Sequence, residues 1–324
     1  MKIVIAGGSG QVGSVLARHF HAKGDEVVIL SRSPKDTPWK TAIWDAQSRG
    51  EWIKELEGAG VLINLTGRIV NCRYNYKHRC EIWSSRARSV RVLGEVVNEL
   101  QSPPKLWLQA STATIYAHSF DKANDEYTGI IGGTEKDSPE KWRFSIDVAR
   151  AWEGEFSLVS TPKTRKVALR SAMVMSYDKD SIFDYLLWLV RLGLGGTAGH
   201  GKQYISWIHY LDFISSLEFI INNAHIEGAV NICSPNPLPN KAFMKILRQA
   251  WGQKIGLPAF EWMLEIGAIF LKTETELILK SRRVMPTRLL NEGFAFSFPD
   301  WKEASKDLCQ KWKETNDPQS PKNP

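Results

Sequence analysis

Cysteine is scarce in this 324-residue sequence, and long apolar runs are absent. The four cysteines are Cys72, Cys80, Cys233 and Cys309. They form no C-x-x-C pair and match no zinc spacing, so we expect free thiols and no metal site. Free thiols and the lack of a signal peptide lead us to expect a cytoplasmic protein. The most apolar stretch, WMLEIGAIFL (262–271), contains Glu265 and falls short of the roughly 18 residues that span a bilayer. We therefore expect no membrane segment.

A continuous block of like charge is also absent, although the net charge is +7. Six lysines and arginines fall within residues 73–91 against one acid, Glu81, and a second basic group lies within residues 280–288. No nucleic-acid motif accompanies either group, so a nucleic-acid binder that uses residues 73–91 is the weakest interpretation. A small ligand that carries phosphates would account for the excess of positive charge.

Short apolar runs alternate with helical stretches through the first half of the chain. The predicted strands are KIVIA (2–6), VVILS (27–31), TAIWD (41–45), VLINLT (61–66), LWLQAS (106–111), KVALRS (166–171) and, returning to the same sheet, GAVNIC (228–233). Residues 11–22 and 81–100 have helical spacing. This alternation predicts an α/β fold built on a Rossmann-type doubly wound parallel sheet.

After residue 171 the alternation ends, and from residue 234 helical segments dominate. Asp212 is predicted to cap the helix 211–222. We expect two units and a tail: 1–171 with about 203–233 as the sheet domain, 172–202 with 234–312 as a smaller, mainly helical C-terminal lobe, and 313–324 as a disordered tail. The tail is predicted from its three prolines and its lack of large apolar side chains.

The segment GGSGQVG (7–13) joins the first strand to the first helix, with Gly7, Gly10 and Gly13 at a three-residue spacing. One glycine permits the tight turn, another lets the backbone approach a pyrophosphate, and the third allows the helix to pack close to the sheet. The phosphates then lie on the free N–H groups of the helix N-terminus, which begins with Gln11 and Val12. The segment predicts a dinucleotide-binding turn.

The end of the second strand indicates which dinucleotide is bound. NAD-binding proteins of this fold place an acidic residue there to bind the adenosine ribose. Here Ser31 and Arg32 occupy the place. A carboxylate would repel a 2′-phosphate, whereas an arginine fork and a serine hydroxyl would hold it. The sequence therefore favours NADP(H), and this reading places an NADP-binding site on the sheet domain.

A charge lies on the apolar face of the helix 81–100. Arg86 falls on the same stripe as Ile82, Val90 and Leu93, so its guanidinium should face the sheet. A buried charge needs a partner or a route to water. Either the cofactor phosphates pair with Arg86, or its side chain extends past the end of the helix to solvent.

Several motifs resemble those of the extended short-chain dehydrogenase/reductases, which include sugar-nucleotide epimerases and dehydratases. They are GGSGQVG, LINLTG (62–67), the stretch from Thr112 to Tyr116, and SWIH-x-x-D (206–212). More narrowly, Ser31-Arg32, E-x-x-x-x-SR at 81–86, GLGG-x-x-G-x-G-x-Q-x-x-SWIH at 193–209 and VMPTRLLNEGFAFSFP near the C-terminus resemble the atypical branch called epimerase family proteins.

The resemblance implies a Rossmann domain with a small C-terminal lobe and an active site in the cleft between them. It also implies which residues contact NADP(H): Ser31, Arg32, Leu65, Thr66, Glu81, Arg86 and Val174. For Arg86, contact with the cofactor agrees with its position on the apolar stripe of the helix 81–100.

The tyrosine and lysine that serve catalysis in the wider superfamily are missing. Glu153 fixes the helix register, which places the tyrosine at 145 and the lysine at 149, where this sequence has Ser145 and Ala149. Neither residue can replace the pair, because serine does not ionise near neutral pH and alanine carries no charge. Thr112 occupies the place of the substrate-binding serine or threonine. Tyr116 is the candidate for a displaced acid, although packing in the core is the stronger interpretation of this tyrosine. His209 is expected to orient the strand-to-helix turn with Asp212.

Two functions remain open. The first is an NADP(H)-dependent oxidoreductase or epimerase-like enzyme, a monomer or homodimer, that acts on a carbonyl or hydroxyl group of a small molecule without the usual pair. The alternative is a non-catalytic NADPH-binding sensor or scaffold that acts through a protein partner.

Overall fold

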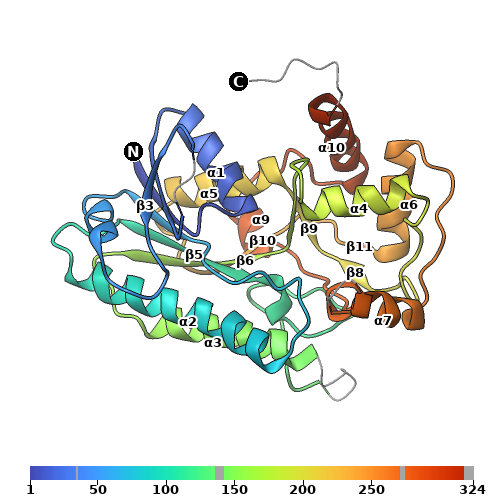
Figure 1. Cartoon of the computed structure of the whole chain (residues 1–324), viewed down its shortest axis with the longest axis horizontal. Helices are drawn as coiled ribbons and strands as arrows, with labels where there is room; N and C mark the ends of the chain where they lie inside the picture. The colour runs from blue at the N-terminus through green and yellow to red at the C-terminus, as the bar shows by residue number, and fades with distance from the viewer. Residues whose placement is uncertain (34–35, 136–141, 271–273, 317–324) are drawn as a thin grey trace.

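A seven-stranded parallel sheet forms the centre of the first unit, in the computed structural model that describes residues 1–33, 36–135, 142–270 and 274–316 (Figure 1). The strand order is β10-β6-β5-β4-β1-β2-β3. The strands are β1 (Lys2–Ala6), β2 (Glu26–Ser31), β3 (Lys40–Ile43), β4 (Val61–Asn64), β5 (Leu106–Thr112), β6 (Arg165–Ser171) and β10 (Gly228–Ile232). All seven predicted strands are confirmed within one to two residues at their ends.

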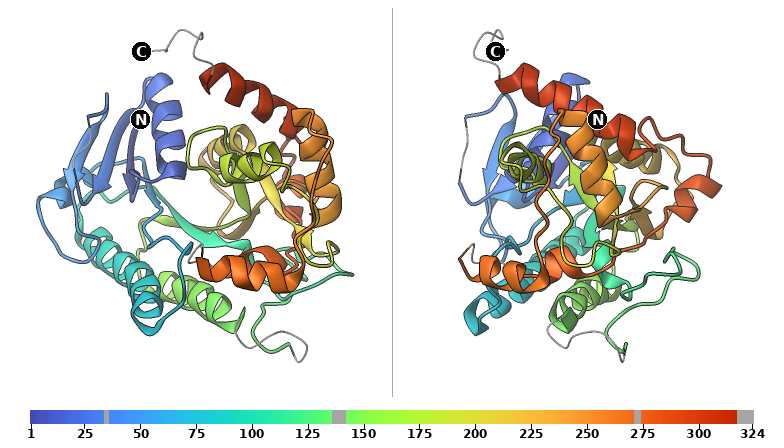
Figure 2. Two further views of the ribbon diagram at one scale, coloured as in Figure 1. Left: turned by 45° about the vertical axis from the view of Figure 1, so that its right-hand side comes forward. Right: turned by 90° about the vertical axis from the view of Figure 1, so that its right-hand side faces the viewer.

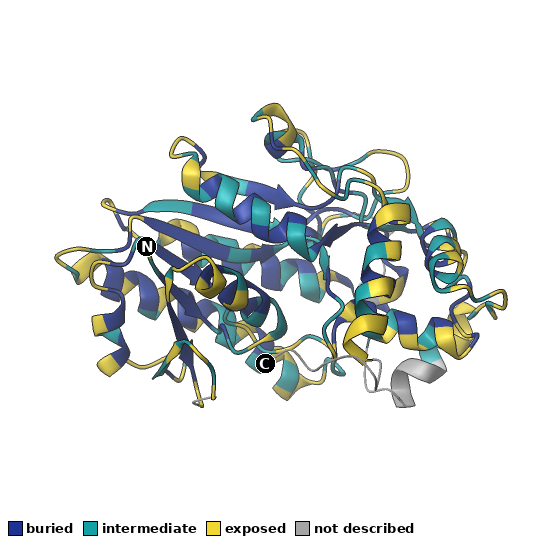
Figure 3. Ribbon diagram, turned by 90° about the horizontal axis from the view of Figure 1, so that it is seen from above, coloured by how far each residue is buried: buried dark blue, intermediate teal, exposed yellow. Residues whose placement is uncertain are grey.

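Helices cover both faces of this sheet, as the doubly wound prediction requires (Figure 1). The helices α1 (Gln11–Ala22) and α5 (Tyr210–Asn222) lie on one face, and α2 (Tyr76–Glu99) and α3 (Arg143–Leu158) lie on the other. The continuous apolar runs of β1, β4 and β5 are buried on both sides, because each face packs on its own helix layer. In Figure 3 the strands are accordingly buried, while the outer faces of the helices are exposed. Short 3₁₀ turns, η1 (Glu51–Glu55) and η2 (Ala113–Ile115), complete this unit.

The C-terminal part is mainly helical, as expected. Its elements are β7 (Met173–Met175), α4 (Ile182–Arg191), β8 (Tyr204–Ile205), β9 (Trp207–His209), β11 (Leu238–Pro239), α6 (Asn240–Trp251), α7 (Glu261–Phe270), α8 (Glu276–Leu279), α9 (Thr287–Asn291) and α10 (Trp301–Asn316). Figure 2 shows α10 alongside α6, and between them Phe243 stacks on Trp301 with ring centroids 4.0 Å apart. A separate apolar core therefore holds this lobe together.

The strands at 204–209 pair outside the large sheet, β8 with β11 and β9 with β7. Helix α10 continues to Asn316, so the prediction of disorder from residue 313 was wrong for its first part. Residues 317–324 of that predicted tail lie outside the described residues.

All four cysteines are free thiols, as predicted. Within the described ranges, no helix combines the length and apolar character that a membrane crossing requires.

Asp212 does not cap α5, so that prediction was wrong. The cap is His209, whose Nδ1 accepts the backbone N–H of Leu211 at 3.3 Å, while its Nε2 lies 3.0 Å from Asp307. The buried Asp212 carboxylate accepts the N–H groups of Ser297 and Phe298 at 2.7 and 2.9 Å. It therefore fixes the segment before α10 against the first turn of α5. His209 orients the turn as expected, but with Asp307 rather than Asp212 as its side-chain partner.

Candidate functional site

The turn between β1 and α1 depends on glycines that lie against neighbouring backbone. Gly7 has φ +73°, and a Cβ there would lie 2.9 Å from both Thr66 Cα and Thr66 N. A Cβ on Gly13 would lie 2.4 Å from Gly8 Cα. Because backbone atoms cannot rotate away as a side chain can, no larger residue fits at Gly13 unless the turn itself moves. The close packing that the glycine spacing predicted is therefore present.

The N-terminus of α1 carries no side-chain cap. Its N-cap is Gly10, no acid lies in the first turn, and the first backbone N–H groups point out of the turn. Beside it, Gln11 Nε2 and Thr66 Oγ1 are buried without a hydrogen-bond partner among the described residues. Buried polar groups are normally paired, so these two atoms indicate a missing ligand. A helix N-terminus flanked by free donors fits the pyrophosphate of a dinucleotide.

Three further predicted cofactor contacts, Val12, Leu65 and Val174, pack on the core of the sheet domain, and their contact with a cofactor stays a prediction. Val12 is partly buried against the α1 side of the core. Leu65 is held by its backbone N–H, which donates to Ala6 O at 2.8 Å and so places the end of β4 beside the end of β1. Val174, from β7, packs on the same core. The structure thus gathers Gly7, Gly10, Gln11, Leu65 and Thr66 at one edge of the sheet.

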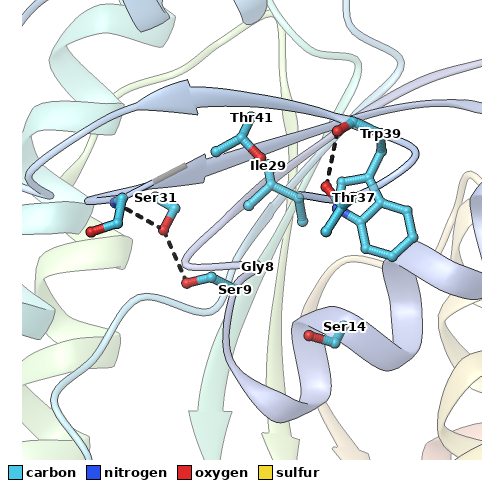
Figure 4. Close-up of a pocket in the computed structure, with 9 residues that line it drawn as sticks. Gly8, Ser9, Ser14, Ile29, Ser31, Thr37, Trp39 and Thr41 are labelled. Atoms are coloured by element: carbon cyan, nitrogen blue, oxygen red, sulfur yellow. Dashed lines mark hydrogen bonds between the residues drawn. The ribbon is translucent and has the colours of Figure 1, made fainter. Parts of the chain in front are cut away.

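The end of β2 lies in a pocket rich in hydroxyl groups (Figure 4). Ser31 is 9% exposed, and its Oγ donates to Ser9 Oγ at 3.0 Å. The pocket is lined by Gly8, Ser9, Ser14, Ile29, Ser31, Ser33, Thr37, Trp39 and Thr41. No carboxylate is among these residues, and Arg32 is exposed next to them. Neutral donors with an adjacent guanidinium fit a ribose 2′-phosphate.

Arg86 is half-buried and lies on the sheet side of α2. Its guanidinium donates to Arg68 O and Ile82 O at 3.1 and 3.0 Å and stacks on the Trp152 ring at 4.9 Å. Burial lowers its pKa to about 10. In the part of the chain that the structure describes, no carboxylate pairs with Arg86, whereas Glu81 pairs with Arg68. Because the guanidinium folds back onto these carbonyls and the Trp152 ring, the side chain does not extend past the end of the helix, and contact of Arg86 with a cofactor stays a prediction.

Tyr116 is not the displaced acid. It is 2% exposed, and its phenol donates to Asn231 Oδ1 and accepts from Arg170 Nη1, both at 2.9 Å. Burial raises the pKa of this phenol. With its hydroxyl engaged on both sides, Tyr116 is a core residue, so its prediction as a catalytic acid was wrong. Thr112 is half-buried at the end of β5, where its Oγ1 accepts the N–H of Thr114 at 3.2 Å. That bond leaves the Thr112 hydroxyl hydrogen free to donate.

Positions 145 and 149, where the sequence predicts that the tyrosine and lysine are replaced, differ in their surroundings. Arg170 pairs with Glu153 at 2.7 Å, which anchors α3 to β6 and supports the register. Ala149 is 0% exposed and packs in the apolar cluster that contains Ile115. Ser145 is half-buried, and its Oγ donates to Glu276 Oε2 at 2.6 Å.

Sequence reasoning missed a group of charged residues from the segment 276–282. Lys280 is 2% exposed, its Nζ donates to Thr114 O at 3.0 Å, and burial lowers its pKa to about 8. Arg282 donates from Nε to Thr114 Oγ1 at 3.0 Å. Glu276 is buried near both, and burial raises its pKa. The only signal in the sequence was the basic group at 280–288, which by itself is typical of a solvated surface.

Comparison with known proteins finds two family models that match parts of the chain and relatives that are similar over nearly all of it. The model of the NAD dependent epimerase/dehydratase family matches residues 3–133, and a domain of unknown function (DUF1731) matches residues 259–308. The human epimerase family protein SDR39U1 is 28% identical over 312 residues, covering 95% of this chain and 99% of that protein. The epimerase family protein YfhF of Bacillus subtilis is 28% identical over 317 residues, covering 95% and 98%.

Solved structures show the same similarity. The crystal structure of human SDR39U1 with NADPH matches with a TM-score of 0.83 at 26% identity, covering 96% of this chain and 99% of that one. A nucleoside-diphosphate sugar epimerase from Corynebacterium glutamicum matches with a TM-score of 0.74 at 26% identity, over 96% of this chain and 58% of that one. Residues 3–133 thus match the NAD dependent epimerase/dehydratase family, and nearly the whole chain is similar to the SDR39U1-like epimerase family proteins.

Proposed function

We propose that the protein binds NADP(H) and acts as an oxidoreductase or epimerase-like enzyme on a carbonyl or hydroxyl group of a small molecule. The observation that carries the proposal is the uncapped N-terminus of α1, packed backbone to backbone at Gly13 and flanked by the unpartnered Gln11 Nε2 and Thr66 Oγ1. Similarity to the human protein crystallised with NADPH supports the same cofactor. When bound, NADP(H) supplies or accepts the hydride.

Residues of this chain would bind the cofactor and polarise the substrate. Ser31 and Arg32 hold the 2′-phosphate, and the first N–H groups of α1 hold the pyrophosphate. Thr112 donates its free hydroxyl hydrogen to the substrate oxygen and so polarises a carbonyl. Buried Ala149 and its apolar neighbours offer no ammonium at the place of the family lysine. Proton transfer therefore needs a group other than the usual pair.

A second candidate is the non-catalytic NADPH-binding sensor, and the closure of the apolar core over Ala149 favours it. The two functions predict the same cofactor affinity but different turnover. Oxidation of NADPH in the presence of a reactive 1,2-diketone, scaled with protein concentration, supports the enzyme. Tight binding without turnover over a panel of carbonyl compounds supports the sensor.

NADPH is expected to bind much more tightly than NADH, because Ser31 and Arg32 stand where an acidic residue would bind the ribose of NAD. Arg32→Asp should weaken NADPH binding by ~1.5–3 kcal/mol, the range of a hydrogen bond to a charged group, and should change NADH binding far less. Calorimetric titration of both cofactors measures this. Arg150→Asp, an exposed arginine on the opposite face of the sheet, is the matched control. Equal dissociation constants of NADPH and NADH for the parent protein contradict the assignment.

Arg86→Ala is expected to weaken NADPH binding and to lower the free energy of unfolding by about 1–2 kcal/mol. The second effect follows from the lost stacking of the guanidinium on Trp152, since desolvated cation–π contacts reach about 2 kcal/mol. Arg88→Ala, on the exposed side of the same helix, should leave both quantities unchanged. Calorimetry and denaturant unfolding report the two effects separately. Normal NADPH affinity in a destabilised Arg86→Ala protein would make Arg86 purely structural.

A further inference from the structure

The turn that follows Thr112 is held by two cations from a distant segment of the chain. Lys280 Nζ donates to Thr114 O at 3.0 Å, and Arg282 Nε donates to Thr114 Oγ1 at 3.0 Å. The backbone N–H of Thr114 in turn donates to Thr112 Oγ1 at 3.2 Å. All three polar groups of Thr114 are therefore hydrogen-bonded, and two of the three partners carry a positive charge.

These bonds restrict the direction of the Thr112 hydroxyl. Because Oγ1 of Thr112 accepts the Thr114 N–H, the hydroxyl hydrogen is left to donate elsewhere. Hydrogen bonds from charged donors are stronger than those between neutral groups, so Lys280 and Arg282 limit the movement of Thr114. Any movement of Thr114 would release the bond that orients Thr112. The two cations thus control the group that the proposed function places on the substrate oxygen.

The segment that carries the cations is itself fixed by hydrogen bonds. The Ser281 backbone N–H donates to His118 Nδ1 at 2.9 Å, and its Oγ donates to Ser119 O at 2.6 Å. The backbone N–H of Arg282 donates to Tyr204 O at 2.9 Å. Both cations are therefore held in place before a substrate binds. Charges fixed in advance stabilise a reacting group most effectively, because they need no reorganisation during the reaction.

The charge of Lys280 is not balanced at short range. Lys280 is almost fully buried, and it forms no ion pair with a carboxylate among the described residues. Burial lowers its pKa to about 8, so the amine is still mainly charged at pH 7. Arg282, in contrast, lies 4.0 Å from the carboxylate of Glu276. Solvent screens a buried charge poorly, so the Lys280 ammonium acts on its neighbours more strongly than a surface lysine would.

The same turn also packs against α3. Ala149 lies in one apolar cluster with Ala113 and Ile115, the residues on either side of Thr114. Position 149 is the place predicted for the family lysine, and alanine brings no charge to it. An ammonium reaches this turn from Lys280 instead, through the Thr114 carbonyl.

We propose that Lys280 and Arg282 are positioning residues of the active site, which hold Thr112 through Thr114 and place behind it the positive charge that Ala149 does not supply. The inference rests on the proposed function. In the reduction of a carbonyl, the carbon takes up the hydride that NADPH supplies, the C=O π electrons move to oxygen, and the oxygen takes a proton from water. Thr112 donates a hydrogen bond to that oxygen while its negative charge develops. The fixed cations behind Thr112 stabilise this charge without touching the substrate.

Hydrogen exchange tests the hold on Thr114 without a substrate. Exchange of the Thr114 amide is measured by NMR in the parent, Lys280→Met, Arg282→Met and Arg283→Met proteins. Loss of either charged bond should speed this exchange about tenfold or more, because the turn opens more often, and should leave the amides of β5 unchanged. Arg283→Met is the matched control, since the Arg283 guanidinium donates to Phe120 O and Asp121 O. Equal Thr114 exchange in all four proteins, or an increase shared by the whole of β5, overturns the hold.

A kinetic test measures the effect of the charges. NADPH-dependent reduction of a 1,2-diketone is followed in the parent, Lys280→Met, Arg282→Met, Arg282→Lys and Arg283→Met. Either loss of charge at 280 or 282 should lower kcat about tenfold or more, with KM and the dissociation constant of NADPH unchanged. Arg282→Lys should keep most of kcat, because lysine and methionine are similar in length but only lysine is charged. If Arg282→Lys falls as far as Arg282→Met, the charge is not what Arg282 contributes and the proposal fails.

Thr114→Val keeps the inference testable where a variant at 280 or 282 does not fold. Valine has nearly the shape of threonine but offers no acceptor to Arg282, so kcat should again fall while KM stays the same. Full kcat in Thr114→Val and Lys280→Met, with normal NADPH binding, overturns this inference alone. A parent protein that binds no NADPH or reduces no diketone overturns the proposed function instead, and the exchange of the Thr114 amide then decides the hold by itself.

Discussion

Gly13→Ala is expected to weaken NADPH binding on the order of 100-fold or more and to destabilise the fold by about 1–3 kcal/mol, the usual cost of overpacking. The new Cβ would lie 2.4 Å from Gly8 Cα and 2.5 Å from Gly8 O, so the turn and the N-terminus of α1 must separate. The N–H groups that bind the pyrophosphate move with them. Loss of two such bonds, at about 1.5–3 kcal/mol each, accounts for the expected change in affinity.

Gly10→Ala is the matched control for the fold. A Cβ there would meet its nearest neighbour, Gly7 O, at 3.6 Å, an ordinary contact, and Gly10 has φ −77°. This variant should melt like the parent protein. Thermal melting with and without NADPH, together with calorimetry, distinguishes the two glycines. If Gly13→Ala melts and binds NADPH as the parent does, the close packing of turn and helix does not control the cofactor site.

The nucleotide end of the site was predictable because it is local in sequence. The strand, glycine turn, helix and second strand lie within the first 31 residues, and their bounds follow from apolar runs and glycine spacing. The inward direction of Arg86 followed from the same periodicity. The periodicity could not predict its contacts with two carbonyls and the Trp152 ring, because Trp152 lies on another helix.

The contacts of the segment 276–282 were not predictable because its partners meet it only in the folded chain. Glu276 binds Ser145 and Lys280 binds Thr114, and neither a motif nor a period links these residues. Sequence position also predicted the wrong role for two residues whose contacts with distant segments determine their role instead. Asp212 has the sequence position of a cap, but its carboxylate binds the segment before α10. Tyr116 lies four residues after Thr112, which made it a candidate acid, but its hydroxyl is hydrogen-bonded to Asn231 of β10 and Arg170 of β6.

Ala149→Lys, which places a lysine at the position predicted for the family lysine, is expected to destabilise the protein by on the order of 3–5 kcal/mol. Ala149 is 0% exposed in a cluster with Ala113, Ile115 and Cys233. The longer side chain overpacks this cluster at a cost of about 1–3 kcal/mol, and its ammonium would be buried without a carboxylate within the cluster. For a chain of this size the loss corresponds to a fall of roughly 10 °C in Tm.

Ala149→Met separates the two costs, because methionine is unbranched and of similar length but carries no charge. Burial depresses the folded-state pKa of the new lysine below its unfolded value of about 10.4. The charge penalty is therefore complete below the folded-state pKa and shrinks as the pH rises towards about 10.4. Tm measured across this range should show the Lys and Met variants converging at high pH. If instead the two variants melt together at neutral pH, an ammonium fits at position 149. With position 149 closed to an ammonium in this way, adding Ser145→Tyr would supply a phenol without the nearby cation that lowers a phenol's pKa.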